Sequence, residues 1–176
     1  MIIRTIIAVT LATALVGCDR PATSSTHMSS SSEPPSISVQ AGDPEMESAM
    51  KTARDRFPDF WREVSADYKR AIPVLEGSMV KAYFYDEGAP LTGEHMWVRQ
   101  VEYDGKTITG VLADTPILLH SVRAGQRVSF PLERLSDWLY VENGKAAGAF
   151  TVKLLRTRMS AEDRKAHDSN YPFTFD

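Results

Sequence analysis

The spacing of the hydrophobic positions changes near residue 78, and this change predicts two kinds of structure. Before it, apolar side chains recur every three or four positions, which is the spacing of one helical face. The residues on that face are Met46, Ala49, Met50, Ala53 and Phe57. Asp43-Pro44 supplies an N-cap and a proline at the first helical position. Pro58 breaks or restarts this helix, and Asp59 to Val64 begin a second turn or short helix.

Beyond residue 78 the hydrophobic period becomes two, as in strands. Strands are expected at 80–85, 95–103, 107–112, 128–130 and 138–142. In the second of them, one face is expected to carry His95, Trp97, Arg99, Val101 and Tyr103. Asp104-Gly105 is a strong two-residue hairpin signal, and Asn143-Gly144 ends the last strand.

The C-terminal part fits more than one structure. Phe150 and Leu154-Leu155 suggest a helix, whereas Thr151-Val152 would suit a strand, and we favour a short helix. Ser160, followed by acidic residues, predicts the start of another helix. The sequence therefore predicts the α+β class: an N-terminal helix packed on a small, twisted antiparallel sheet of about five strands, with short C-terminal helices. The sheet could curl into an SH3-like partial barrel.

The first 17 residues have the layout of an export signal. Arg4 is the charged residue of this segment, and an apolar run of about eleven residues follows, too short for a bilayer, which needs roughly 20. Leu15-Val16-Gly17-Cys18 resembles the lipobox of bacterial lipoproteins. The resemblance implies acylation of Cys18 and cleavage before it, which makes the membrane an expected partner. The alternative is an ordinary secretory signal with a chance cysteine.

Cys18 is the single cysteine of the chain, so an internal disulfide is excluded. Lipidation would remove a free thiol from an oxidising compartment. We therefore expect a lipid-anchored protein of the bacterial envelope that faces the periplasm. Asp19 resembles the signal for retention in the inner membrane, which slightly favours that membrane.

Composition divides the rest of the chain in two. Residues 18–42 are rich in Ser, Thr and Pro and lack aromatic side chains, which predicts a disordered tether behind the lipidated cysteine. Residues 43–176 are enough for one domain with its own core. The formal net charge of −3 gives no reason to expect nucleic acid as a partner. Phosphate-binding glycine loops and spaced metal ligands are absent from the sequence, so no cofactor and no metal is expected.

A group of segments, taken in order, is similar to a known bacterial family. They are Gly93–Val98, Thr109–Pro116, Gly125–Val128, Ser136–Tyr140, Asn143–Lys145 and Leu154–Ser160. In this order they resemble the YegJ-like family, a domain of unknown function (2314), over about residues 44–164. The family often carries Gly-Gly-aromatic where this chain has Gly148-Ala149-Phe150, and Asn where it has Asp114. The resemblance identifies a fold unit and implies no reaction.

Three residues are candidates for acid–base chemistry. His95 is the residue type that most often acts as a general base near neutral pH. Its neighbour Glu94 would point to the opposite face of a strand, so a partner would have to be Asp114 or Asp137. The alternatives are a His95 that pairs across the sheet and an Asp137 that caps a turn or accepts backbone N–H groups.

A binding surface is the other kind of candidate site. Arg, Tyr and Trp dominate the energetics of interfaces, and several lie in or beside the expected sheet. The candidate binding residues are Trp97, Arg99, Arg127, Trp138 and Tyr140. Ordinary core aromatics and solvated arginines are the alternative interpretation.

The sequence thus supports a ranked set of roles. The first is a non-catalytic binding module that engages an envelope protein. A sharper version is an immunity-type or inhibitor protein that neutralises a periplasmic toxin. The others are an envelope hydrolase that uses His95 with Asp114 or Asp137, and a mainly structural envelope protein.

Overall fold

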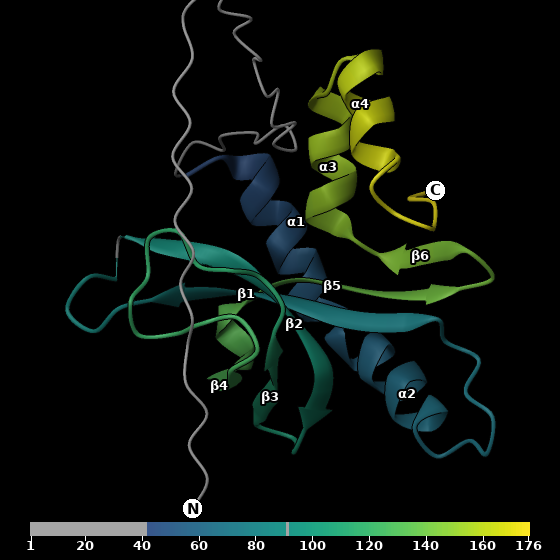
Figure 1. The fold of residues 1–176 in the computed structure, drawn as a ribbon, viewed down its shortest axis with the longest axis horizontal. Helices are drawn as coiled ribbons and strands as arrows, with labels where there is room; N and C mark the ends of the chain where they lie inside the picture. The colour runs from purple at the N-terminus through teal and green to yellow at the C-terminus, as the bar shows by residue number, and fades with distance from the viewer. Residues whose placement is uncertain (1–41, 91) are drawn as a thin grey trace, which may run out of the picture. The chain divides into compact units, whose positions relative to one another are not determined.

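Six antiparallel strands form one open sheet in the computed structural model, which describes residues 42–90 and 92–176 (Figure 1). The strand order is β4-β3-β2-β1-β5-β6. The strands are β1 (Gly77–Tyr85), β2 (Gly93–Tyr103), β3 (Thr107–Leu112), β4 (Arg127–Pro131), β5 (Leu135–Glu142) and β6 (Lys145–Gly148). The helices are α1 (Pro44–Asp55), α2 (Phe57–Asp67), α3 (Phe150–Arg158) and α4 (Ala161–Asp168), and a 3₁₀ turn, η1 (Leu132–Arg134), precedes β5. The α+β class is confirmed.

The predicted signal, Cys18 and the predicted tether up to residue 41 lie outside the described residues. Within residues 42–90 and 92–176, no helix has both the length and the apolar character needed to span a bilayer.

Local signals at the helix starts lie where the sequence placed them. The Asp43 carboxylate accepts the N–H groups of Glu45 and Met46 at 3.0 and 3.1 Å, and Pro44 opens α1. Pro58 stands in the first turn of α2, where its missing N–H costs nothing. Ser160 caps α4 by accepting the N–H of Asp163. The helix favoured for residues after Phe150 is also present as α3.

The sheet differs from the prediction in strand number. The strand that the sequence analysis missed is β6, which pairs with β5 through a two-residue turn at Asn143-Gly144. Both turn residues have positive φ, 51° and 71°, as a type I′ hairpin requires. The hairpin at Asp104-Gly105 is also present, but its loop runs from Asp104 to Lys106 and so has three residues.

A bulge in β2 overturns part of the predicted face. Gln100 has φ 54°, and the register with β3 shifts between Arg99 and Glu102. The extra residue rotates the strand by one position. Val101 is therefore fully buried in the core rather than beside Trp97, and Tyr103 packs on the core with it.

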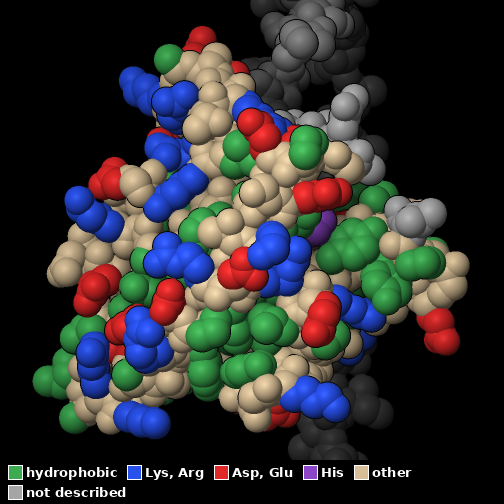
Figure 2. Space-filling view, turned by 180° about the vertical axis from the view of Figure 1, so that it is seen from behind, with side chains coloured by type: hydrophobic (Ala, Val, Ile, Leu, Met, Phe, Trp, Pro, Cys, Tyr) green, Lys and Arg blue, Asp and Glu red, His purple; other side chains and the backbone are tan. Residues whose placement is uncertain are grey.

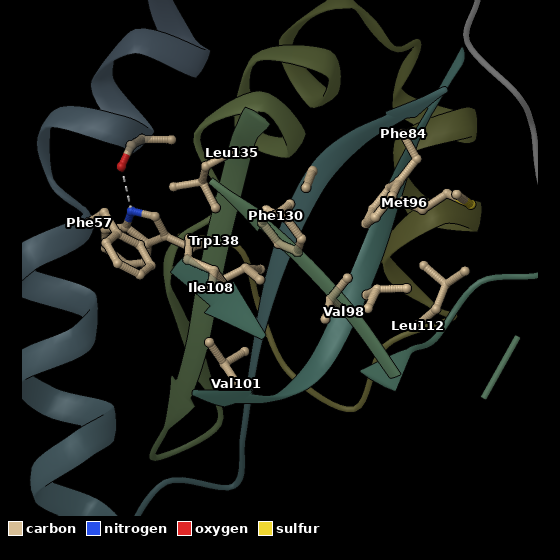
Figure 3. Packing of buried hydrophobic residues seen from close by; sticks show 14 of the residues in the cluster. Phe57, Phe84, Met96, Val98, Val101, Ile108, Leu112, Phe130, Leu135 and Trp138 are labelled. Carbon is tan, nitrogen blue, oxygen red and sulfur yellow. Dashed lines mark hydrogen bonds between the residues drawn. The ribbon is translucent and has the colours of Figure 1, made fainter. Parts of the chain in front are cut away.

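The main core lies between one face of the sheet and the first two helices. Phe57, Phe60 and Val64 of α2 meet alternate residues of β1, β2, β3 and β5 there (Figure 3). Trp138 is anchored in this core, because its Nε1–H donates to the Ala53 carbonyl at 2.8 Å (Figure 3). Hence Trp138 fixes β5 to α1.

A smaller core covers part of the opposite face. Leu139 and Val141 of β5 pack there against Val152 of α3 and Phe175 near the C-terminus. Thr174 then pairs with β6: its carbonyl accepts the N–H of Ala146 at 2.8 Å. The C-terminal segment thereby shields one edge of the sheet, as exposed edges require. The other edge is β4, so the sheet stays open and the SH3-like partial barrel is not confirmed.

Candidate functional site

Asp137 is a fully buried carboxylate at the junction of β5 and α3. Its Oδ1 accepts the N–H groups of Trp138 and Phe150 at 2.8 and 2.9 Å. Its Oδ2 accepts the Thr151 N–H at 2.8 Å and the Thr151 hydroxyl. Burial raises the pKa of Asp137, whereas these hydrogen bonds favour its charged form. Asp137 therefore caps the start of α3, whose N-cap residue, Ala149, has no polar side chain to do so.

The backbone beside Asp137 explains how one carboxylate reaches two N–H groups of α3. Gly148 and Ala149 both have positive φ, 75° and 56°. A Cβ on Gly148 would lie 2.4 Å from the Trp138 carbonyl oxygen, so only glycine fits there. This tight turn brings the first N–H groups of α3 back over β5.

The three candidate catalytic residues make different contacts and do not meet in one site. The Asp114 carboxylate accepts the Trp97 N–H at 2.7 Å and so ties the chain after β3 to β2. The His95 ring packs against Tyr83, with centroids 4.9 Å apart. Across residues 42–90 and 92–176, the hydrogen-bonded His–carboxylate pair is His167 with Asp168, which does not involve His95.

The charge state of His95 follows from its surroundings. The side chain is exposed on the sheet face opposite the main core. Nevertheless, desolvation by neighbouring atoms, with the positive charge of Lys81 as a second cause, lowers the pKa of His95 to about 4. His95 is therefore neutral at physiological pH.

The five candidate binding residues do not share one face. Trp138 is buried in the main core, and Tyr140 stacks beside it with ring centroids 6.2 Å apart. Trp97, Arg99 and Arg127 lie on the opposite face. The predicted set thus divides into two residues of the main core, Trp97, which is partly buried against the smaller core, and two exposed arginines of the outer face.

The outer face of β1 and β2 carries a continuous row of aromatic and basic side chains, which we call the β1–β2 strip. Its members are Lys81, Tyr83 and Tyr85 of β1, His95 and Trp97 of β2, and Arg134 of η1. Strand pairing sets Lys81 opposite Trp97 and Tyr83 opposite His95. The sequence already contained this signal, because alternation in β1 places residues 81, 83 and 85 on one face.

Contacts along the strip join its members in pairs. The Lys81 ammonium lies 5.3 Å from the centre of the Trp97 ring, a cation–π distance. Tyr83 and Tyr85 are 5.9 Å apart between ring centres. Arg134 lies 4.4 Å from the centre of the Tyr85 ring and donates to its hydroxyl at 2.9 Å. Burial lowers the pKa of Lys81, although Asp137 and Asp114 favour its charged form.

The loop between β3 and β4 (113–126) is held by two carboxylates that sequence reasoning missed. Glu94 accepts the N–H groups of Ile117, Leu118 and Leu119, with Oε1 2.9 and 3.0 Å from the nitrogens of the first and the last. Asp86 accepts the N–H groups of residues 120 and 121, both at 3.1 Å. These bonds fix a loop tip at which Ile117 is 87% exposed and Leu118 is 52% exposed.

The described residues contain no cluster of His, Cys, Asp and Glu that could hold a metal ion. The strip presents aromatic ring faces beside positive charges. The loop presents two exposed apolar side chains on a backbone that is held in place. Both are features of recognition surfaces.

Comparison with known proteins gives the chain relatives but no assigned activity. The pattern of the family described as "Uncharacterized protein conserved in bacteria (DUF2314)" matches residues 43–175. The "Putative ankyrin repeat protein NMB1133/NMB1171" of Neisseria meningitidis serogroup B is 36% identical over 138 residues, which are 78% of this chain and 54% of that protein. The chain thus spans about half the length of this relative. The "Uncharacterized protein YegJ" of Escherichia coli K12 is 29% identical over 121 residues, which are 67% of this chain and 71% of YegJ. No solved structure matches the chain.

Proposed function

The chain belongs to the DUF2314 family of uncharacterised bacterial proteins, and we propose that it is a non-catalytic binding module that engages an envelope protein through the β1–β2 strip and the 113–126 loop. The observation that carries this proposal is the juxtaposition of aromatic and basic side chains along one uninterrupted pair of strands.

The strip suits recognition because its side chains are already ordered. Tyr83 donates to the Pro90 carbonyl at 3.1 Å, and the Tyr85 hydroxyl is fixed by Arg134. A partner that covers these rings would gain aromatic contact area while little further side-chain entropy is lost. The neutral His95 adds a ring that can donate or accept a hydrogen bond at low desolvation cost.

The loop supplies exposed apolar side chains at the end of the two strands where Glu94 and Asp86 hold it. Ile117 and Leu118 project from a backbone that Glu94 holds through consecutive N–H groups. Full burial of an aliphatic side chain contributes roughly 1.5–3 kcal/mol. Two such side chains on a fixed loop are therefore enough to act as hot spots in an interface.

Binding is favoured over acid–base chemistry by the way in which the carboxylates are used. Asp114 and Asp137 accept main-chain N–H groups, and His95 packs against Tyr83. A general base works best when its pKa lies near the operating pH, whereas the pKa of His95 is lowered to about 4.

The location is the second part of the proposal. We propose that acylated Cys18 anchors the protein in the envelope and that residues 18–42 tether the domain to the membrane on its periplasmic side. Support comes from the lipobox-like tetrad and the Ser/Pro-rich segment behind it. A module of this kind fits an immunity-type or inhibitor role as well as other binding roles. The Neisseria relative, whose name refers to ankyrin repeats, extends well beyond the matched region, as expected for a transferable module.

The test is photocrosslinking of the lipoprotein expressed from its own promoter in the host bacterium. A photoreactive amino acid replaces Arg99, which is exposed on β2 two residues beyond Trp97 of the strip, or Leu118 of the loop, and Glu47, which is exposed on α1, in the matched control. We expect one partner to crosslink from both surface positions and not from the control. With the purified partner, Ile117→Ser should weaken binding about tenfold, the effect of losing roughly 1.4 kcal/mol.

Two results would overturn the proposal. One is a partner that crosslinks from position 47 as strongly as from positions 99 and 118. The other is turnover of an envelope substrate by the purified protein that His95→Ala abolishes, since this would make the module an enzyme.

A further inference from the structure

The loop between α2 and β1 carries three exposed apolar side chains beside two basic ones. Tyr68, Ile72 and Val74 are 52%, 81% and 47% exposed. Lys69 and Arg70 lie between them in the sequence and are also exposed. Residues 68–75 contain no acidic side chain, in a chain whose formal net charge is −3. Figure 2 shows hydrophobic side chains beside Lys and Arg side chains at lower left, where this loop lies.

The loop is held in shape by a buried acid. Asp67 is 4% exposed, and its Oδ1 accepts the Val74 N–H at 2.8 Å and the Leu75 N–H at 3.4 Å. The same oxygen lies 3.3 Å from the Arg70 guanidinium. The two ends of the loop are therefore joined, and Ile72 is presented at its tip. Little ordering entropy remains to be lost when this tip enters an apolar phase.

From this arrangement we propose that the 68–74 loop docks the domain onto an anionic lipid bilayer. Its basic side chains suit the anionic headgroups of such a bilayer, and its exposed aliphatic and aromatic side chains suit the acyl boundary beneath them. A protein partner is a poorer fit, because stable interfaces use about 20–30 residues a side and this patch offers seven. Of the two acids that flank the loop in the sequence, Asp67 is buried and pairs with Arg70, and Glu76 accepts the Gly144 N–H at 2.9 Å, which leaves Lys69 as the unpaired basic side chain among residues 68–75.

Docking at this loop would orient the proposed binding surface. The loop directly precedes Gly77, the first residue of β1, whereas Asp86, which holds the 113–126 loop, directly follows Tyr85, the last. At about 3.3 Å per residue, β1 separates the two ends by roughly 25 Å. Figure 1 shows the two loops at opposite ends of β1: the α2–β1 loop is at lower right, and the β1–β2 loop is at far left. A domain seated on its 68–74 loop would hold the 113–126 loop away from the membrane.

The experiment uses the full chain with Cys18→Ser, so that an introduced cysteine is the single labelling site. An environment-sensitive dye is attached at Ile72→Cys, or at Ala124→Cys in the exposed turn before β4 as the matched control. The protein is titrated with vesicles of phosphatidylglycerol or of phosphatidylcholine. A dye at the site reports local insertion, so adsorption of the apolar first residues does not mimic it.

We expect a blue shift and at least a twofold rise in emission at position 72 on phosphatidylglycerol vesicles, and no change at position 124. The joint substitutions Lys69→Gln and Arg70→Gln should weaken the apparent vesicle affinity about tenfold or more, since each basic side chain near an anionic surface contributes roughly a factor of five. The inference is overturned if the dye at position 72 stays in water, or if it responds equally to phosphatidylcholine. A concentration-dependent shift without vesicles would also overturn it, in favour of a second copy of the chain. None of these outcomes bears on the proposed protein partner.

Discussion

Replacement of Asp137 tests whether one buried carboxylate holds α3 to the sheet. Asp137→Ala would leave the N–H groups of Trp138, Phe150 and Thr151 without their acceptor in a region that water does not reach. An unsatisfied buried donor costs about 1–3 kcal/mol, and part of that cost is relieved by rearrangement. The charge that faces the start of α3 is lost as well. We therefore expect the free energy of unfolding to fall by about 4 kcal/mol.

Asp137→Asn removes the negative charge of the side chain but keeps its shape. The Oδ1 of Asn can still accept two N–H groups, but its amide group faces the Thr151 N–H, and two donors then oppose each other. We expect a loss of about 2 kcal/mol, between wild type and Asp137→Ala. Glu142→Gln, on an exposed side chain of the same strand, is the matched control and should change stability by less than about 0.5 kcal/mol.

Urea unfolding followed by tryptophan fluorescence measures these differences, since Trp138 lies beside the substituted residue. Hydrogen exchange at Phe150 and Thr151 gives a local measure of the same contact. An Asp137→Ala variant that loses less than about 1 kcal/mol would refute the reasoning. So would an Asn variant as stable as wild type.

The other predictions concern the loop brace and the titrating groups. Glu94→Ala removes the acceptor of the three N–H groups at the loop tip, so hydrogen exchange there should quicken, with a loss of about 1 kcal/mol in unfolding free energy. Unchanged exchange would contradict the role of Glu94 in holding the loop. Lys81→Met removes a positive charge, so the pKa of His95, read by imidazole NMR, should rise above about 4, while desolvation by neighbouring atoms keeps it below 6.5. Because the folded pKa of His95 is depressed, protonation favours the unfolded chain, and stability should fall as pH drops from 6.5 towards 4. The Arg156 guanidinium holds the pKa of Asp168 at about 2, so the stability that this pair contributes is present above pH 3.8 and is lost as pH falls towards 2. In Arg156→Met, the unfolding free energy measured with urea should therefore depend less on pH over that range.

The fold class could be predicted because its signals are local. The Asp43 cap, the helical spacing before Phe57 and the alternation of β1 each act within a few residues. The strand β6 was missed because Lys145-Ala146-Ala147-Gly148 has no β-branched or aromatic side chain. Asn143-Gly144 is nevertheless a strong hairpin signal, and such a signal predicts a partner strand directly after it.

Only some of the residues on the outer face could be predicted, because the pairing register of the strands determines which side chains lie there. A single residue, Gln100, moves Val101 from the expected outer face into the core, and no pattern in the sequence marks that bulge. Trp97 and Trp138 look alike as strand aromatics. Their separation onto opposite faces depends on which residue of β1 each one meets, Lys81 or Val80.

The acidic residues of the domain share a role that residue type alone does not reveal. Asp67, Asp86, Glu94, Asp114 and Asp137 each accept main-chain N–H groups and so fix a loop or a helix start. A carboxylate whose oxygens are occupied in this way is committed to the main chain and is not free to contact a substrate. The same bonds make the segments that they hold rigid, and the exposed side chains of those segments, Ile72 and Ile117, are the ones with the most surface to offer a partner. In this domain these acids are thus better understood as the supports of its surfaces than as its chemistry, which is why both proposals rest on loops that a carboxylate holds.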